Sequence, residues 1–123
     1  MKLWKYIKIY SNKIKITILR FGITYSNRKN GGSAVESIFK QIKDKQKITI
    51  GSLQTSRRFI HVSDIVLGIL KAIKYNKGGI FNLVGQKDIT LKKIILNSQR
   101  ILNKKVKVYS TNQKPSIRIV KII

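Results

Sequence analysis

The sequence predicts an α/β fold, because stretches with the apolar periodicities of strands and of helices alternate along its 123 residues. Strand-like stretches occur at residues 16–21, 48–50, 58–62, 80–84 and 106–108, and helix-like stretches begin near residues 3, 33, 63 and 90. The resulting order is helix, strand, helix, strand, strand, helix, strand, helix, strand. This alternation favours parallel or mixed pairing of the strands.

The first helix and strand indicate what the fold requires around them. Leu3, Ile7 and Tyr10 fall on one side of the first helix, with lysines elsewhere. Residues 16–21 are nearly continuously apolar, and such a strand needs cover on both faces, as parallel sheets provide. The chain has few elements to supply that cover. We therefore expect part of the sheet to be missing upstream of this chain. The polar residues 22–32, which end in glycines, are expected to form a loop.

The three later helices each begin at an N-cap signal. Ser33 and Glu36 form an S-x-x-E capping box. Ser63 and Thr90 are suitable N-caps, and the glycines at 78–79 end the middle helix. The first of these helices carries Val35, Ile38, Phe39 and Ile42 on one face. In the second, apolar residues recur at i, i+4 and i+8, namely Ile65, Val66, Ile69, Leu70 and Ile73. In the third, Leu91, Ile94, Ile95 and Leu102 are expected to face inward.

The composition is that of a globular chain. Hydrophobic residues make up 42%, and no apolar run approaches the roughly 20 residues of a membrane span. Lysines in the first residues interrupt any signal-peptide core, so we expect a cytoplasmic protein with no membrane partner. The lack of cysteine excludes disulfides, thiolate metal sites and cysteine nucleophiles. One histidine and four scattered acids make no metal site, and no G-x-S-x-G or P-loop motif occurs.

The chain is also very basic, with a formal charge of +23 from 27 basic and 4 acidic residues. One interpretation is a nucleic-acid or anionic-membrane partner. The other is biased residue usage, because the excess is mostly lysine beside abundant isoleucine and asparagine, as in a product of AT-rich DNA. The lysines are spread from Lys2 to Lys121 without a block of about five or six like charges, which favours biased usage.

Four local patterns occur in a fixed order. They are TILRFG at residues 17–22 followed by Tyr25, ITIGSLQTSRRFIHVSD at 48–64, GIFNL at 79–83, and Thr90-Leu91 opening a helix that precedes Lys104-Lys105-Val106. Together they resemble the extended short-chain dehydrogenase/reductases, the NAD-dependent sugar-nucleotide epimerases and dehydratases. The resemblance spans Thr17 to Val108 and covers about the last third to half of a family member.

This resemblance implies an incomplete Rossmann-like fold, the C-terminal half of an extended short-chain dehydrogenase/reductase, with mixed short strands and three to four helices. The whole chain, 1–123, is then a single partial domain. Residues 1–32 correspond to the end of the Rossmann-type sheet, and residues 33–123 to the substrate-binding portion.

The resemblance also implies site residues. Arg57 matches the arginine that binds the nucleotide-sugar diphosphate in the family, and a guanidinium fork suits phosphate oxygens. Tyr25 matches a tyrosine of the loop that lines the sugar and nicotinamide pocket, where Ile23 and Thr24 fall at cofactor-binding positions. Arg28 is either a phosphate ligand or a solvated loop arginine. A further phosphate-binding arginine of the family corresponds to Arg118.

The sequence also departs from the family pattern. Ile23 replaces the usual asparagine, Ser26-Asn27 replace Gly-Pro, and Arg58 stands where the family has aspartate, which removes a local ion pair. Outside these motifs, Asp64 is expected to stabilise a helix N-terminus. His61 and Asn82 are expected to be hydrogen-bonded structural residues.

The family's NAD(P) and catalytic motifs are missing from this chain. It has no G-x-x-G-x-x-G turn. Tyr25 and Lys29 have the Tyr-x-x-x-Lys spacing but lie in a loop after a strand rather than on a helix. We therefore expect a truncated substrate-binding half that neither turns over nor holds NAD(P) alone. Its substrate by resemblance is a nucleotide-diphosphate sugar, and poor solubility is expected because apolar strand faces are uncovered.

Two alternatives remain at this stage. One is a small basic nucleic-acid-binding protein, which predicts steeply salt-dependent binding. The other is an interaction fragment that pairs, through its open sheet edge, with the missing N-terminal half or with an intact homologue.

Overall fold

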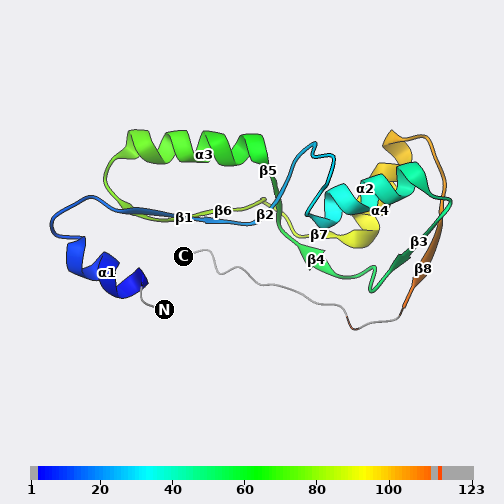
Figure 1. Cartoon of the computed structure of the whole chain (residues 1–123), viewed down its shortest axis with the longest axis horizontal. Coiled ribbons are helices and arrows are strands. Elements are labelled where there is room, and N and C mark those ends of the chain that lie inside the picture. The colour runs from blue at the N-terminus through cyan, green and yellow to red at the C-terminus, as the bar shows by residue number, and fades with distance from the viewer. Residues whose placement is uncertain (1–2, 112–113, 115–123) are drawn as a thin grey trace.

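The structure is a computed structural model that describes residues 3–111 and residue 114, with side chains from residue 5. In this range the elements are α1 (Leu3–Tyr10), β1 (Thr17–Phe21), β2 (Ile23–Tyr25), α2 (Ala34–Asp44), β3 (Lys47–Ile50), β4 (Ser56–Arg57), β5 (Phe59–His61), α3 (Val62–Tyr75), β6 (Gly79–Leu83), β7 (Ile89–Thr90), α4 (Leu91–Ile101) and β8 (Lys107–Ser110) (Figure 1). None of the helices described here has the length and apolarity needed to cross a membrane.

The strands form four separate pairs, and the mixed α/β prediction is confirmed. Three pairs are parallel, β1 with β6, β2 with β5, and β3 with β8, whereas β4 and β7 are antiparallel. The chain runs from β1 through most of the other elements before α3 leads into β6. The elements from β2 to β5 are therefore inserted between β1 and α3 of the parallel β1–α3–β6 unit. The β2–β5 pair lies where the chain leaves this unit after β1 and returns to it before α3 (Figure 1).

One end of the molecule, here called the closed lobe, consists of α2, β3, β4, β7, α4 and β8 (Figure 1). The helices α2 and α4 pack on each other and on β3, and their isoleucines form the hydrophobic core of the protein. Ile42 is wholly buried. The core residues are Ile38, Ile42, Ile48, Ile50, Ile94 and Ile95.

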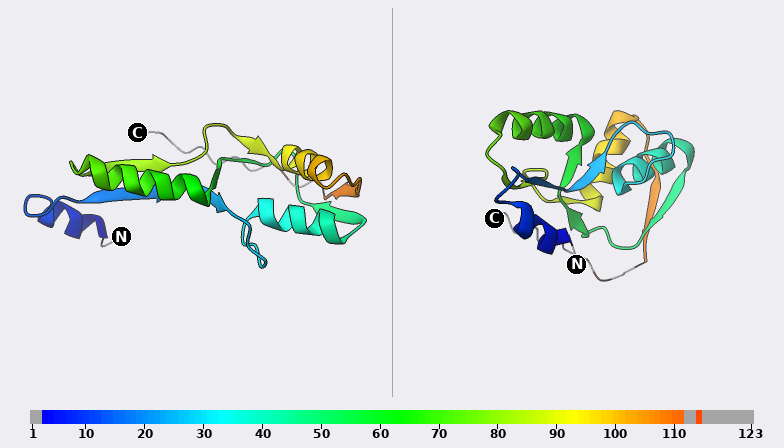
Figure 2. Two further views of the ribbon diagram at one scale, coloured as in Figure 1. Left: turned by 90° about the horizontal axis from the view of Figure 1, so that it is seen from above. Right: turned by 60° about the vertical axis from the view of Figure 1, so that its left-hand side comes forward.

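The other end, here called the open lobe, consists of α1, β1, α3 and β6, with α3 running alongside the strand pair (Figures 1 and 2). Gly68 allows α3 to approach β6 closely, since a Cβ at that position would lie 2.8 Å from the Leu83 side chain. Tyr75 of α3 meets Phe81 of β6 edge to face, with ring centroids 5.7 Å apart. Large apolar side chains nevertheless remain exposed over much of this lobe.

The predicted helix ends are confirmed at two caps and wrong at a third. The capping box of Ser33 and Glu36 is present, and the Thr90 side chain accepts a hydrogen bond from the backbone of Lys93. The N-cap of α3 is His61 rather than Ser63, because the imidazole accepts from the backbone N–H of Ser63. The same helix ends before the glycines, at Asn76, in the left-handed conformation with φ 47°.

The sequence did not predict three of the strands, β2, β4 and β7. Residues 22–32 were expected to form only a loop, but residues 23–25 pair with β5. The two-residue strands β4 and β7 pair only with each other. Of the apolar residues that recur along α3, Ile65 is the one buried residue of the helix, whereas Val66, Leu70 and Ile73 are exposed.

Candidate functional site

A groove of about 620 Å³ lies where the segment after β2 folds against α2. Its walls come from β2, from residues 26–29, from α2 and from the end of β5. It is lined by Tyr25, Ser26, Asn27, Arg28, Lys29, Val35, Glu36, Phe39, Lys40, Lys43, Asp44 and His61.

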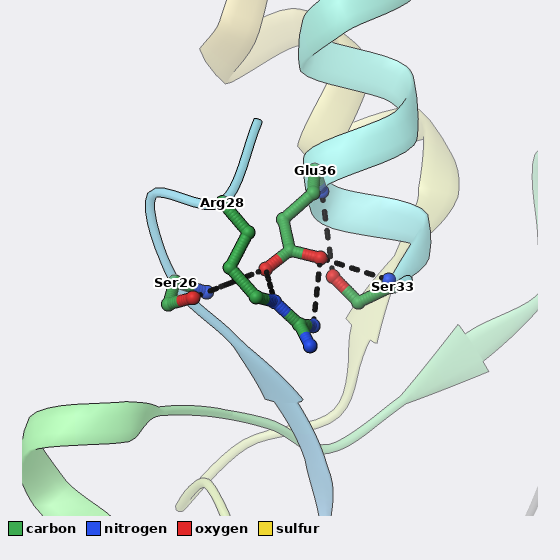
Figure 3. Close-up of polar contacts among 4 residues, drawn as sticks. All are labelled: Ser26, Arg28, Ser33 and Glu36. Carbon is green, nitrogen blue, oxygen red and sulfur yellow. Dashed lines mark hydrogen bonds and ion pairs between the residues drawn. The ribbon is translucent and has the colours of Figure 1, made fainter. Parts of the chain in front are cut away.

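The carboxylate of Glu36 holds one wall of this groove in place (Figure 3). Oε1 accepts from the backbone N–H of Ser26 at 2.8 Å and from Nε of Arg28 at 2.9 Å. Oε2 accepts from Nη2 of Arg28 at 3.0 Å and from the backbone N–H of Ser33 at 2.9 Å. This group of four residues, here called the Glu36 clasp, ties the loop to the first turn of α2.

The clasp changes the acidity of both ionised groups. The Arg28 hydrogen bond, followed by the Ser33 backbone N–H, holds the pKa of Glu36 far below its ordinary value, although burial opposes the shift. The same hydrogen bond raises the pKa of Arg28. The Glu36 side chain is only 4% exposed, whereas that of Arg28 is 55% exposed. Glu36 is therefore charged at neutral pH. Two of the Arg28 donors, Nε and Nη2, are occupied by its carboxylate.

Gly31 makes the clasp sterically possible. A Cβ at this position would lie 2.2 Å from the Glu36 Cβ, closer than real side chains approach. The adjacent Gly32 has more room, because a Cβ there would meet only Nη2 of Arg28, at 3.7 Å. The first glycine is thus fixed by packing against Glu36 and the second is not.

An aromatic pair forms another part of the groove. The Tyr25 and His61 rings meet edge to face with centroids 5.2 Å apart, because parallel pairing of β2 and β5 sets these two residues opposite each other. The imidazole is held by Ser63, whose Oγ lies 2.7 Å from Nδ1. The expectation that His61 is hydrogen-bonded is confirmed.

The groove combines apolar and cationic side chains. Val35 and Phe39 are partly buried on its α2 side, and Lys29, Lys40 and Lys43 line it together with Arg28. Its acids are Asp44 and Glu36, and the Glu36 carboxylate is paired with Arg28. Such a surface suits a ligand that carries both a ring system and negative charge.

Arg57 lies outside the lining of this groove. It is half-buried on β4 opposite Ile89 of β7, and its Nη1 donates to the carbonyl oxygen of Ser56 at 2.7 Å. Its neighbour Arg58 pairs with Asp88 at 3.5 Å. The chain therefore has an ion pair at the position where the replacement of aspartate by arginine was expected to remove one.

The segment that carries Arg57 is tied to the start of α4. The backbone N–H groups of Leu91 and Lys92 donate to the carbonyls of Thr55 and Leu53, both at 3.0 Å. The first turn of α4 holds no acidic residue. The segment before Arg57 is thus hydrogen-bonded to a helix start that has no acid in its first turn.

The residues expected to face a cofactor, Ile23 and Thr24, are half-buried in β2 and pair with β5. The glycine-preceded start of α2 does not fit a dinucleotide pyrophosphate. The backbone N–H groups of Ser33 and Glu36 already have side-chain acceptors there, and the Glu36 carboxylate would repel phosphate. No group of His, Cys, Asp and Glu in the described residues has a metal-binding arrangement.

A protein-family comparison decides the wider identity of the chain. The model of the NAD dependent epimerase/dehydratase family matches residues 3–84, from α1 through β6. The chain belongs to this family. No curated protein sequence matches it significantly.

Several solved structures, two of them named as epimerases, share the fold of this family member. One is a mutant UDP-glucuronic acid 4-epimerase from Bacillus cereus in complex with UDP-4-deoxy-4-fluoro-glucuronic acid and NAD. It matches with a TM-score of 0.76 and 23% identity over 93% of this chain and 38% of its own. A putative epimerase from Burkholderia cenocepacia gives a TM-score of 0.79 and 20% identity over 98% of this chain and 40% of its own. RMD from Pseudomonas aeruginosa, complexed with NADPH, gives a TM-score of 0.79 and 12% identity over 93% of this chain and 41% of its own. The chain thus spans about two fifths of the length of these proteins.

In this epimerase/dehydratase chain, the structure brings Tyr25 and Arg28 to one groove and leaves Arg57 outside its lining. Arg118 lies outside the described residues. Sequence reasoning identified Glu36 only as a helix cap and did not identify the basic groove wall. The available signal was the spacing of Val35, Phe39 and Lys43, which places all three on one face of α2.

Proposed function

We propose that the chain is the substrate-side half of an NAD-dependent epimerase/dehydratase and binds the diphosphate of a nucleotide sugar through Arg57. The observation that carries this proposal is the fixed position of Arg57. Its backbone is paired with β7, and the segment before it is bonded to the first turn of α4. Its Nη1 donates to the Ser56 carbonyl, and a guanidinium on a backbone held in this way can present its planar fork to two phosphate oxygens.

The family match supports the choice of ligand. It includes both the Arg57 segment and the β2 loop. Solved proteins of the same fold have been captured with such ligands, for example UDP-glucuronic acid with NAD and UDP-N-acetylmuramic acid. We assign Tyr25 and Arg28 to the sugar side of this ligand, Ile23 and Thr24 to the border with NAD(P), and Arg118 to a second phosphate contact.

Binding without turnover is the activity we propose for the chain alone. Tyr25 and Lys29 have the family's base spacing, but both lie on or after β2 rather than on a helix. The described start of α2 does not suit the NAD(P) pyrophosphate. Hydride transfer therefore depends on a Rossmann-type half carried by another stretch of protein.

Calorimetric titration of the purified chain with UDP-glucuronic acid and with UDP tests this function. Arg57→Ala should weaken binding at least about tenfold, the effect of losing one charge-assisted phosphate contact. Arg100→Ala is the matched control, because Arg100 is exposed in the last turn of α4 and its removal changes the net charge equally. It should change affinity less than about twofold. Equal losses in both variants would contradict the assignment of Arg57.

The formal charge of +23 makes nucleic acid the alternative ligand, and a second arm of the same experiment tests it. A 20-base-pair DNA duplex is titrated at two salt concentrations. If it binds more tightly than the UDP sugar, with a steep loss of affinity at higher salt, nucleic-acid binding replaces nucleotide-sugar binding as the function.

A further inference from the structure

The parallel β3–β8 pair lies at one end of the closed lobe, and its two faces differ in character (Figure 1). Ile48, Ile50 and Val108 pack in or against the hydrophobic core. The alternate residues of both strands are exposed, because successive side chains of a strand point to opposite faces. These outward residues are here called the lysine face and consist of Lys47, Thr49, Lys107 and Tyr109.

The strand register sets like charges side by side on the lysine face. Lys47 lies directly opposite Lys107, on strands that are about 4.8 Å apart. Like charges at opposed positions on neighbouring strands are destabilising. The hollow beside this pair has a volume of about 470 Å³ and is lined by Gln46, Lys47, Lys105, Val106 and Lys107. Within the described residues, this lining includes no acid that could offset the repulsion, so an anionic ligand would relieve it.

An aromatic ring lies beside these cations. Tyr109 follows Lys107 on the same face of β8, lies opposite Thr49 of β3, and is 52% exposed. Lysines attract the phosphates of a nucleic acid, and unpaired bases stack on exposed aromatic rings. A basic strand pair that carries an exposed tyrosine is therefore suited to a nucleic acid whose bases are not paired.

We propose that the lysine face binds single-stranded nucleic acid, with Lys47, Lys105 and Lys107 contacting phosphates and Tyr109 stacking on a base. In the sequence these cations belong to two distant segments, and the pairing of β3 with β8 brings them together. The surface lies on β3 and β8, whereas Arg57 lies on β4. This binding activity therefore goes beyond the proposed nucleotide-sugar contact and uses different residues.

Fluorescence anisotropy of a fluorescein-labelled oligonucleotide of about ten thymidines tests the proposal. The wild-type chain should bind it with a Kd of about 10 μM or tighter at physiological salt. Lys47→Gln/Lys107→Gln should weaken binding at least about tenfold. It should also reduce the slope of log K against log salt by about 1.4, since each phosphate contact on a single strand contributes about 0.7. An oligonucleotide that does not bind the wild type would overturn the proposal.

The matched control is Lys8→Gln/Lys74→Gln, which changes the net charge equally. Both lysines are exposed, and each lies in the last turn of an open-lobe helix. This variant should change the affinity for the oligonucleotide less than about twofold. If both double variants lose affinity alike, the attraction is a property of the net charge and the proposal is wrong. Circular dichroism shows whether each variant is folded.

A substitution at Tyr109 tests stacking separately from charge. Tyr109→Leu should weaken binding of the oligonucleotide about tenfold. It should leave binding of a 20-base-pair duplex of about equal affinity to the wild type, because paired bases cannot stack on the ring. Tyr6→Leu is the control, since Tyr6 is 57% exposed on α1 in the open lobe. Unchanged binding of the single strand by Tyr109→Leu would reject the choice of single-stranded nucleic acid.

Two further measurements separate the lysine face from other sites and partners. UDP-glucuronic acid should not displace the oligonucleotide, and displacement would overturn the assignment to a separate surface. Vesicles that contain phosphatidylserine and bind more tightly than the oligonucleotide would overturn the choice of nucleic acid. An oligonucleotide that binds through the lysine face while UDP-glucuronic acid fails to bind retains this inference and rejects the Arg57 assignment.

Discussion

The two lobes differ in what their apolar side chains contact rather than in how apolar they are. In the closed lobe, six isoleucines from α2, β3 and α4 are each at most 8% exposed. In the open lobe, α3 carries apolar side chains on two of its sides but has only one buried residue, Ile65. The closed lobe therefore contains its own core, and the open lobe contains half of one.

The two lobes therefore depend on different stabilising contacts. In the closed lobe, helices of this chain pack on each other, so its stability comes from contacts within the chain. A parallel sheet covered on one side gains little from burial until other elements cover it. The open lobe is therefore expected to open more readily than the closed lobe in the isolated chain.

The largest expected effect comes from removing a core side chain. Ile42 is 0% exposed, so Ile42→Ala should lower the free energy of unfolding by about 3–4 kcal/mol. The same truncation at Ile73, which is 67% exposed, should cost less than about 0.5 kcal/mol. Urea denaturation followed by circular dichroism measures both. Similar losses would erase the distinction between the lobes.

The next effect concerns the Glu36 clasp, which ties the β2 segment to the closed lobe. Glu36→Gln removes the charge that Arg28 and two backbone N–H groups contact, and should lower Tm by about 6 °C. The matched control is Asp44→Asn, an exposed acid on the same helix, which should change Tm by less than about 1 °C. Differential scanning fluorimetry is sufficient, and an unchanged Tm in Glu36→Gln would show that the clasp is dispensable.

A smaller effect is expected at the glycine that packs on the clasp. Gly31→Ala should lower Tm by about 4 °C, because the new Cβ would press on the Glu36 side chain. Gly32→Ala, one residue away, has room for its methyl group and should be nearly neutral or slightly stabilising. If the two variants melt alike, the loop is not held against α2 as described.

The smallest effect is a dependence on pH. The clasp depresses the pKa of Glu36 below its ordinary value of 4.5, so its stabilisation is complete above that value and declines as pH falls below it. The Tm difference between the wild type and Glu36→Gln should therefore be constant from pH 7 to about pH 5 and shrink by pH 3. A difference that stays constant or grows on acidification would contradict this linkage.

Local signals in the sequence predicted the closed lobe well. Capping by Ser33 and Thr90 and inward packing of Ile94 and Ile95 depend on contacts within one or two helical turns, which spacing reveals. The short strands β2, β4 and β7 were missed, because two or three residues carry no periodicity and pair only with distant segments. The capping of α3 by His61 was missed because Ser63 is the commoner capping residue.

The site was predictable only in part. The motifs placed Tyr25 and Arg57 on their segments, but the bond between Arg28 and Glu36 crosses a loop whose path no local pattern specifies. The apolar spacing of α3 predicted an apolar face correctly. It did not predict that most of that face would be exposed, because spacing reports which residues are apolar and not what covers them.

Amide hydrogen exchange of the isolated chain tests the central distinction most directly. Amides of α2, β3 and α4 should exchange slowly, at a rate set by global unfolding, whereas those of β1, α3 and β6 should exchange at least about a hundredfold faster. Equal protection of both lobes in the isolated chain would contradict the account.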